Sequence, residues 1–300
     1  IFALTPSSTE NRKPSISQKC YIIFVFLILT VGASVSLYLR RFFYRRFSLM
    51  QLAMRIIMDI DLYLHNCYSL LILMVIKRYR WFKLIKTLRF VDCPEYKNHH
   101  YLIFISTHIV FFSITCFNLT VWPTILALGF KYLKQYSVES IQNYTQFFYS
   151  VFAYIVLKMI LARYRHQTSL LREKVCTKRH LKYLRKIKRN LFFLKDSVDV
   201  FNDIFGWIFL FNIIFGVAKS LIHLDLIVLS LNGFRNGSSN FKSTVRFLAD
   251  INVVFIFWME FLSTALICDE ILKEFDKILT VANRLVMNFN ENDEVESFFN

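Results

Sequence analysis

A few ionisable side chains stand inside long apolar stretches of the sequence, and these are the residues that could do chemistry. Lys219 and Glu260 each lie near the middle of an apolar stretch, and His223 follows Lys219 by four residues. On a helix, that spacing puts Lys219 and His223 on the same face. Ionisable groups in an apolar medium are costly, so they mark either a buried pair or a functional cavity. We expect an ion pair between Lys219 and Glu260, or a watery outer cavity that all three residues line. The two interpretations are compatible.

Aromatic side chains could form the walls of such a cavity, with a small molecule as the ligand. For each aromatic residue alone, packing against lipid or a neighbouring helix is the commoner role. Tyr154 is one candidate for the wall. The predicted ligand-binding set consists of Trp122, Tyr149, Lys219, His223, Phe255 and Trp258.

Three further charged residues lie closer to the ends of apolar stretches. We expect Asp59 and Asp61 at the outer end of their helix, in contact with water. Lys158 is expected to extend its ammonium group to the inner interface. None of the three is assigned a ligand.

The sequence predicts neither an enzyme nor a cofactor. It has no HExxH motif, no glycine-rich phosphate loop and no nucleophile elbow. The 6 cysteines do not follow the spacing of a disulfide framework or a zinc site. His99 and His100 lie in a loop without partner ligands, so no metal site is predicted.

The composition indicates an all-α membrane protein. Of the 300 residues, 55% are hydrophobic, and there are only 6 glycines and 4 prolines. Membrane helices satisfy their own backbone hydrogen bonds and need apolar surface all round. The formal net charge of +16 comes from short clusters between apolar runs. This distribution favours contact with an anionic cytoplasmic leaflet, so the bilayer is an expected partner and nucleic acid is not.

Six stretches are long and apolar enough to cross a bilayer, which takes about 20 residues. Most Lys and Arg residues fall in the loops that alternate crossings place on one side, and this predicts a cytosolic amino terminus. Residues 1–19 form a polar cytosolic leader. The predicted fold is a polytopic helix bundle over residues 20–268, with spans at 20–39, 56–76, 101–130, 144–162, 204–231 and 251–268.

Glycosylation sequons agree with this orientation. The sequons at Asn143 and Asn236 both fall in segments predicted to be external, so these two residues are the expected acceptors. A third sequon at Asn118 lies within an apolar helix and is discarded.

Residues 163–203 are predicted to form long cytosolic helical extensions. Apolar residues recur every three or four positions from Leu181 to Phe201, and no Gly or Pro interrupts the segment. The alternative is an amphipathic helix that lies on anionic lipid. We favour the projecting helix, because its apolar stripe continues into the fifth predicted span.

Short motifs in this region resemble the insect gustatory receptor family. A basic helix beginning at His180 leads into the run Asp199 to Gly206, in which Asn202 precedes the Phe205-Gly206 pair. The stretch from Cys268 through Glu270 to Glu274 is similar to the family's segment after the sixth helix. The resemblance covers the topology of essentially the whole chain.

The resemblance implies a receptor subunit in the plasma membrane. Family members are cation channels formed by four subunits and gated by small molecules. We therefore expect a ligand-gated, non-selective cation channel opened by a small-molecule tastant, and a homo- or hetero-tetramer with other gustatory receptors. The family also has a seventh, pore-lining helix with a cytosolic approach to it. Residues 269–300 are expected to be that approach, and the chain is expected to be a fragment that lacks the seventh helix.

Other receptor and transporter classes fit less well. An insect odorant receptor shares the architecture and is the closest alternative; the residues around Asn202 favour the gustatory branch. A G-protein-coupled receptor should carry an Asp-Arg-Tyr-like triplet after its third helix, where this chain has Lys131-Tyr132-Leu133. A small-solute transporter should show repeated halves and broken helices, and neither is visible.

Overall fold

The computed structural model describes residues 16–45, 47–91, 99–125, 130–174, 180–235 and 241–288. Over these residues every regular element is a helix and no strand occurs, as the composition predicts. The helices, in chain order, are α1 (Ile16–Tyr44), α2 (Leu49–Cys67), the π-helix η1 (Tyr68–Ile76), α3 (Arg78–Phe90), α4 (His99–Ile125), α5 (Phe130–Lys174), α6 (His180–Arg235) and α7 (Phe241–Asn288).

Five of these helices are long and apolar enough to cross a membrane, judged by length and composition. Their candidate spans are Ile16–Phe42, Leu49–Leu73, Lys134–Arg172, Arg185–Asn232 and Phe247–Val281. Each contains or overlaps one predicted span. The third predicted span, 101–130, corresponds to α4, whose apolar stretch Leu102–Phe117 is shorter than the other five. The number of crossings and the side on which each end lies stay predictions.

Local sequence signals explain how α2 begins and continues. Ser48 accepts a hydrogen bond from the backbone N–H of Gln51 and the side chain of Gln51 accepts one from the backbone of Ser48, so the pair forms a capping box. The helix then widens into η1 before α3 begins at Arg78. The predicted span 56–76 includes η1, but neither its π-helical form nor the helix α3 was expected from the sequence.

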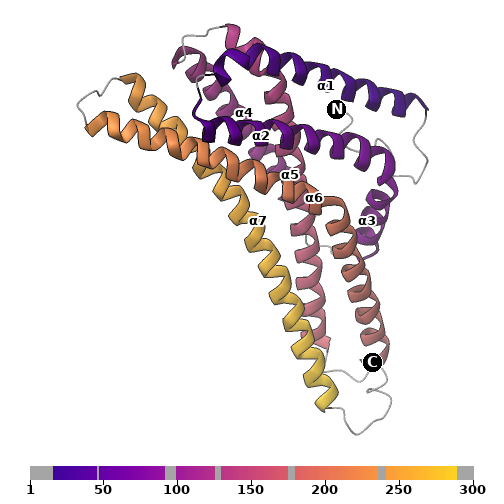
Figure 1. Cartoon of the computed structure of the whole chain (residues 1–300). Coiled ribbons are helices and arrows are strands. Elements are labelled where there is room, and N and C mark those ends of the chain that lie inside the picture. Colours follow the sequence, from indigo (N-terminus) through magenta and orange to yellow (C-terminus); the bar gives the residue numbers. More distant parts are fainter. Residues whose placement is uncertain are drawn as a thin grey trace.

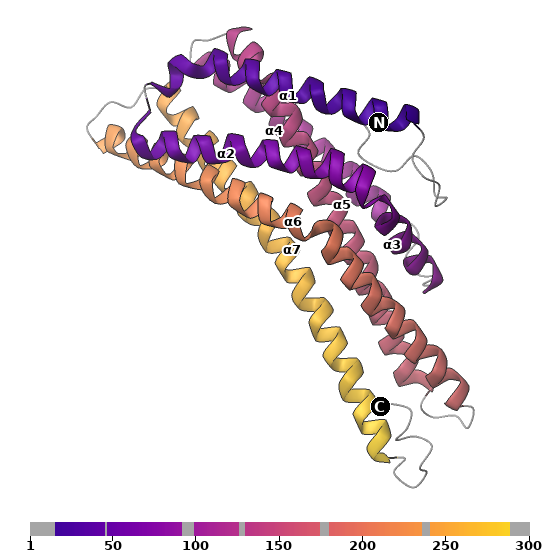
Figure 2. The same cartoon turned by 45° about the vertical axis from the view of Figure 1, so that its right-hand side comes forward.

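The helices gather into a bundle from which three of them extend (Figures 1 and 2). The bundle comprises α1, α2, α4 and one end of each of the long helices α5, α6 and α7. The other ends of α5, α6 and α7 run away from the bundle together. With 48 residues, α7 alone is about 72 Å long at 1.5 Å per residue, more than twice the roughly 30 Å of a hydrocarbon core. Part of α7 must therefore lie outside any bilayer that the bundle crosses.

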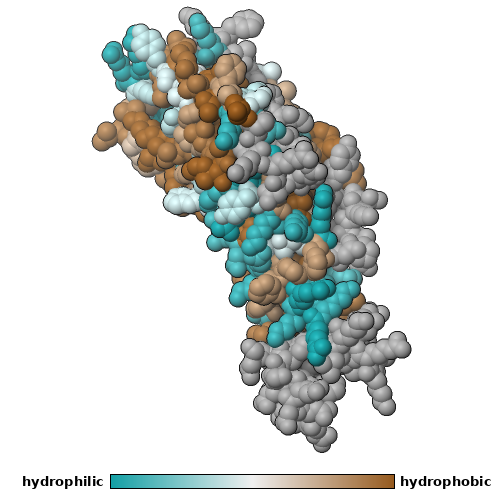
Figure 3. Space-filling view, turned by 90° about the vertical axis from the view of Figure 1, so that its right-hand side faces the viewer, coloured by the Kyte–Doolittle hydropathy of each residue, from teal (hydrophilic) through white to brown (hydrophobic). Residues whose placement is uncertain are grey.

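The predicted helical extension is a pair of continuous helices in the structure. α5 continues through Lys174, and α6 runs from His180 through the basic segment and the fifth predicted span without a break. The space-filling view agrees with this division, because apolar surface dominates the bundle and polar surface the extension (Figure 3). We call the extended parts of these helices, residues 163–174 of α5, 180–203 of α6 and 269–288 of α7, the stalk.

The apolar core runs along the contacts between α5, α6 and their neighbours. Tyr149 and Ile160 on α5 and Ile204 and Phe205 on α6 are fully buried in it, and Trp81 of α3 packs at 5.6 Å from Phe205, ring centre to ring centre. α6 bends partway along its length (Figure 1). Near the middle of α6, the carbonyl of Ile204 accepts a hydrogen bond of 3.2 Å from the hydroxyl of Tyr68, and a side chain that bonds to a helix carbonyl favours bending of the helix.

Candidate functional site: a buried polar network between the helices

Four charged side chains from three helices meet inside the bundle. Arg40 of α1 lies 2.7 Å from Glu139 of α5 and 3.5 Å from Asp59 of α2. Arg55 of α2 also pairs with both Glu139 and Asp59. Their exposed fractions are only 3% for Arg40 and 14% for Arg55. Two arginines and two carboxylates balance in charge, so this four-charge cluster compensates the cost of burying each member.

Two tyrosines complete the four-charge cluster. The hydroxyl of Tyr44 donates a hydrogen bond of 2.5 Å to Asp59, and the guanidinium of Arg40 lies 5.0 Å from the centre of the Tyr136 ring. Burial, followed by the charge of Asp59, raises the pKa of Tyr44 to about 12. Tyr44 therefore stays a neutral hydrogen-bond donor at every physiological pH.

Further polar contacts tie the remaining long helices to this end of the bundle. The amide of Gln51 on α2 donates to Asp225 on α6 at 2.5 Å. His223 on α6 lies 2.7 Å from the fully buried Asp250 on α7. Together with the four-charge cluster, these contacts link α1, α2, α5, α6 and α7 through polar side chains. We call the whole set the polar network.

The expected ion pair between Lys219 and Glu260 does not form a direct contact. Among the residues that the structure describes, no salt bridge within 4.0 Å joins them, and Glu260 is exposed on α7. The Lys219 ammonium lies 5.3 Å from the centre of the Phe215 ring, and Glu139, Arg55 and Glu260 are the charged groups that act on it. Lys219 therefore lies in the electrostatic field of the four-charge cluster. His223, which was grouped with Lys219, has Asp250 as its own partner.

The predicted ligand-binding residues differ in burial where the structure describes their side chains. Tyr149 is fully buried in the core, whereas Phe255 and Trp258 are 60% and 43% exposed on α7. Exposed aromatic rings on a long apolar helix are what contact with lipid or another helix requires. Trp122 lies near the end of α4, and its side chain is outside the described residues. Lys219 and His223 share a face of α6, as the spacing predicts.

Asp59 and Asp61 lie deeper than expected. Asp59 belongs to the four-charge cluster, and Asp61 is only 4% exposed. The expectation that both would be in contact with water is wrong, because α2 packs against α5 and α6 along this face. The position of a residue along its helix predicts how far it lies from the end of the span. It does not predict which neighbouring helices cover the residue.

Of the two predicted glycosylation sites, the structure describes Asn143 but not Asn236. Asn143 lies inside α5, and its side-chain oxygen is buried without a hydrogen-bond partner, so this placement does not favour modification. Asn236 lies outside the described residues.

The positions that carry the family resemblance lie on α6 and α7. Phe205 is fully buried, and a Cβ atom added at Gly206 would lie 3.2 Å from the side-chain oxygen of Asn202, one turn earlier. Cys268 is exposed on α7. Glu274 is 8% exposed and accepts hydrogen bonds from Thr168 of α5 at 3.2 Å and from Lys277 at 2.6 Å. Glu274 therefore ties α7 to α5 within the stalk.

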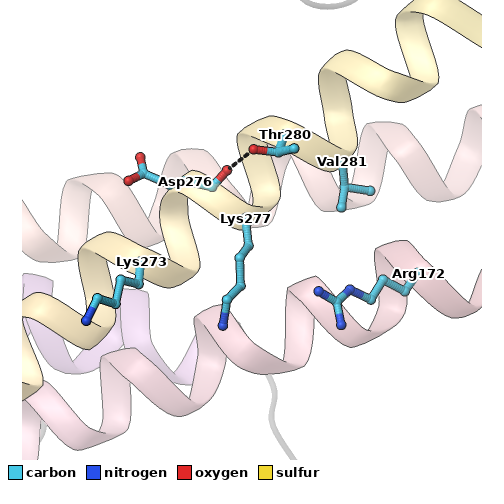
Figure 4. A pocket seen from close by; sticks show the side chains of 6 residues that line it. All are labelled: Arg172, Lys273, Asp276, Lys277, Thr280 and Val281. Atoms are coloured by element: carbon cyan, nitrogen blue, oxygen red, sulfur yellow. Dashed lines mark hydrogen bonds between the residues drawn. The ribbon is translucent and has the colours of Figure 1, made fainter.

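A cavity of about 430 Å³ lies between α5 and α7 in the stalk (Figure 4). Arg172 contributes from α5 and the other lining residues from α7: Lys273, Asp276, Lys277, Thr280 and Val281. Lys273 is paired with Asp269 at 2.5 Å and Lys277 with Glu274 at 2.6 Å. The two lysines of this cavity are thus paired with carboxylates of their own helix. Among the described residues, no group of three or more His, Cys, Asp or Glu could hold a metal ion.

Sequence reasoning missed the four-charge cluster. Of its four members, the sequence singles out only Asp59, and not Arg40, Arg55 or Glu139. One signal was available, because Arg55 and Asp59 are four residues apart and can pair on one helix face. The contacts to Arg40 and Glu139 depend on tertiary packing and carry no local signature.

No protein-family model and no curated protein matches the sequence.

Proposed function

We propose that this protein is a subunit of a chemosensory receptor of the gustatory type, acting in the plasma membrane as a ligand-gated, non-selective cation channel. The observation that carries the proposal is the architecture of α5, α6 and α7. Each combines an apolar span with a charged extension, and the three extensions run together as the stalk. A membrane bundle with a helical cytosolic anchor is what the resemblance around Asn202 and Gly206 implies.

The polar network is consistent with a bundle that has more than one stable arrangement. Its contacts join five helices by directional hydrogen bonds and ion pairs, and such contacts hold one arrangement until they are exchanged as a group. A ligand that binds better to a second arrangement shifts the population toward it. In the proposed mechanism, a small molecule between the helices moves α5, α6 and α7 relative to one another, and the stalk transmits this movement to neighbouring subunits.

The proposal is tested by recording from cells that express the full-length product of the gene, alone and with other gustatory receptors. Surface biotinylation first establishes that the protein reaches the plasma membrane. We expect tastants to evoke a cation current that reverses near 0 mV, as a non-selective pore requires. Absence of current across a broad tastant panel, despite surface expression in every combination, would count against the proposal. A response restricted to volatile odorants would favour the odorant branch instead.

A control variant separates gating from assembly. Arg165→Ala removes an ion pair in the stalk whose partners, Arg165 and Glu270, are 55% and 48% exposed. Exposed pairs contribute little to stability, so this variant should reach the surface and conduct as the parent does. Arg55→Ala removes a partner from the four-charge cluster and should shift the ligand concentration that opens half of the channels.

A further inference from the structure

One buried carboxylate in the bundle lacks a counter-ion. Asp61 on α2 is 4% exposed, no ion pair reaches it among the described residues, and its Oδ2 atom is buried without a hydrogen-bond partner. Other buried or half-buried carboxylates of the described chain do have cationic or amide partners; examples are Asp59, Glu139, Asp203, Asp225 and Asp250. An uncompensated carboxylate inside an apolar bundle is among the most costly arrangements a helix can hold.

Asp61 belongs to a buried polar face of α2 that continues into η1. His65 follows by four residues and Ser69 by eight, and both are fully buried. Neither ring nitrogen of His65, nor the hydroxyl of Ser69, nor the side-chain oxygen of Asn66 has a hydrogen-bond partner in the described chain. Buried polar groups in proteins are almost always hydrogen-bonded, so four such side chains on one face require an explanation. We call this set the α2 polar face.

The α2 polar face is bordered by aromatic rings. The imidazole of His65 lies edge-on to Tyr149 of α5 at 6.0 Å and to Phe211 of α6 at 6.2 Å, ring centre to ring centre. Asn212, next to Phe211, also has a buried side-chain oxygen without a partner. Most of the unpartnered atoms beside these rings are acceptors, namely the carboxylate of Asp61 and the amide oxygens of Asn66 and Asn212. His65 and Ser69 each add one donor and one acceptor.

This combination selects one ligand chemistry. A carboxylate and amide oxygens accept hydrogen bonds, and aromatic rings attract cations through their faces. A protonated amine supplies both a positive charge and N–H donors. A neutral alcohol leaves the carboxylate uncompensated, and an anion is repelled by it.

We propose that the α2 polar face is a binding site for a small protonated amine, with Asp61 as its counter-ion, Asn66 as a hydrogen-bond acceptor, and Tyr149 and Phe211 beside it. The proposal names the ligand class of the receptor proposed above and rests on that function for its biological meaning. Amine binding itself is measured without any channel activity.

The test compares three probes of nearly equal shape and different charge on the purified full-length protein in lipid nanodiscs. The probes are phenethylamine, 2-phenylethanol and phenylacetate, and the readout is the thermal unfolding midpoint as a function of probe concentration. A ligand that binds only the folded state raises the midpoint. We expect phenethylamine to raise it and the alcohol and the anion to leave it unchanged.

Substitution then assigns the counter-ion. Asp61→Asn should weaken phenethylamine binding by about thirtyfold or more, the low end of what losing one partner of a buried charge pair costs. Asp276→Asn, at an exposed position of the stalk, is the matched control and should bind as the parent does. The comparison of probes on the unmodified protein needs no variant, so a folding defect in Asp61→Asn leaves the test intact.

Each contrary result overturns a defined part of the inference. Equal stabilisation by amine and alcohol, or none by any probe, overturns the amine site. Unchanged phenethylamine affinity in a folded Asp61→Asn protein overturns the role of Asp61. Amine binding without tastant-evoked current contradicts the channel proposal alone, whereas currents evoked by neutral tastants with no amine binding contradict only the site.

Discussion

At the scale of single residues, the structure shows how a bundle of long apolar helices distributes buried charge. Arg40, Arg55, Asp59 and Glu139 compensate one another, and Tyr44 and Tyr136 fill the positions around them. Lys219 lies in the field of this cluster without joining it. Among the described residues, the members of the four-charge cluster are thus paired with one another, whereas the α2 polar face holds groups without partners.

The four-charge cluster should be sensitive to the loss of a single partner. Arg55→Ala leaves Glu139 with Arg40 as its one remaining salt-bridge partner among the described residues, and breaking a buried pair costs about 3–5 kcal/mol. We expect a loss near the low end of that range, measured by the thermal unfolding midpoint of the purified protein. Adding Glu139→Gln to Arg55→Ala should recover part of the loss, because it removes the uncompensated charge.

The matched control is a pair of the same type on the surface. Arg165→Ala breaks the exposed contact with Glu270 and should cost at most about 1 kcal/mol. If both arginine variants unfolded at the same temperature, the four-charge cluster would have no special stabilising role.

The sequence predicted which charged residues lie within apolar helices, but not which of them contact one another. His223 and Lys219 share a face of α6, which follows from helical spacing. The partners of these residues come from other helices: Asp250 for His223, and the Glu139 field for Lys219. Asp61 was expected in water and is buried, because the sequence gives no information on which helix covers that face.

At the scale of elements, the length of the helices could be predicted and their packing could not. The uninterrupted basic segment predicted a long helix, and α6 is continuous from His180 to Arg235. The sequence pattern predicts neither the π-helical form of η1 nor the helix α3. Lys77, which lies between them, pairs with Asp203 of α6, a tertiary contact without a local sequence pattern. Close approach of two helices depends on where small residues face each other.

The contact between α6 and α7 provides an example that can be tested. A Cβ atom added at Gly216 of α6 would overlap the ring of Phe257 on α7. Overpacking of this kind typically costs about 1–3 kcal/mol, so Gly216→Ala should lower the thermal unfolding midpoint. Phe257→Leu in the same chain should restore part of it, because the smaller side chain makes room.

Gly206→Ala is the control for the intrinsic helix preference of alanine. The nearest atom to a new Cβ there is the side-chain oxygen of Asn202 at 3.2 Å, which a small rotation relieves. Alanine favours helices by up to about 1 kcal/mol over glycine, so this variant should be neutral or stabilised. Equal destabilisation at both glycines would show that α6 tolerates no substitution, rather than that α7 crowds Gly216.

At the scale of the whole molecule, the division into bundle and stalk follows from chemistry that the sequence displays. On the face shown in Figure 3, apolar surface prevails over the bundle and polar surface over the coloured part of the stalk. The same asymmetry underlies the predicted orientation, because most of the basic residues of α5 and α6 that the structure describes lie in the stalk. Lys and Arg are retained on the cytosolic side during insertion. The stalk should therefore be cytosolic, and the turn between α1 and α2 should lie on the opposite side.

Single added cysteines test this orientation at both ends of the molecule. Ser48, the exposed cap of α2, should react with a membrane-impermeant maleimide in intact cells as Ser48→Cys. Thr280, exposed on α7 in the stalk, should react as Thr280→Cys only after the membrane is permeabilised. The parent chain supplies the background from its native cysteines. The reverse pattern would invert the orientation, and with it the assignment of the stalk as the cytosolic anchor on which the proposed gating depends.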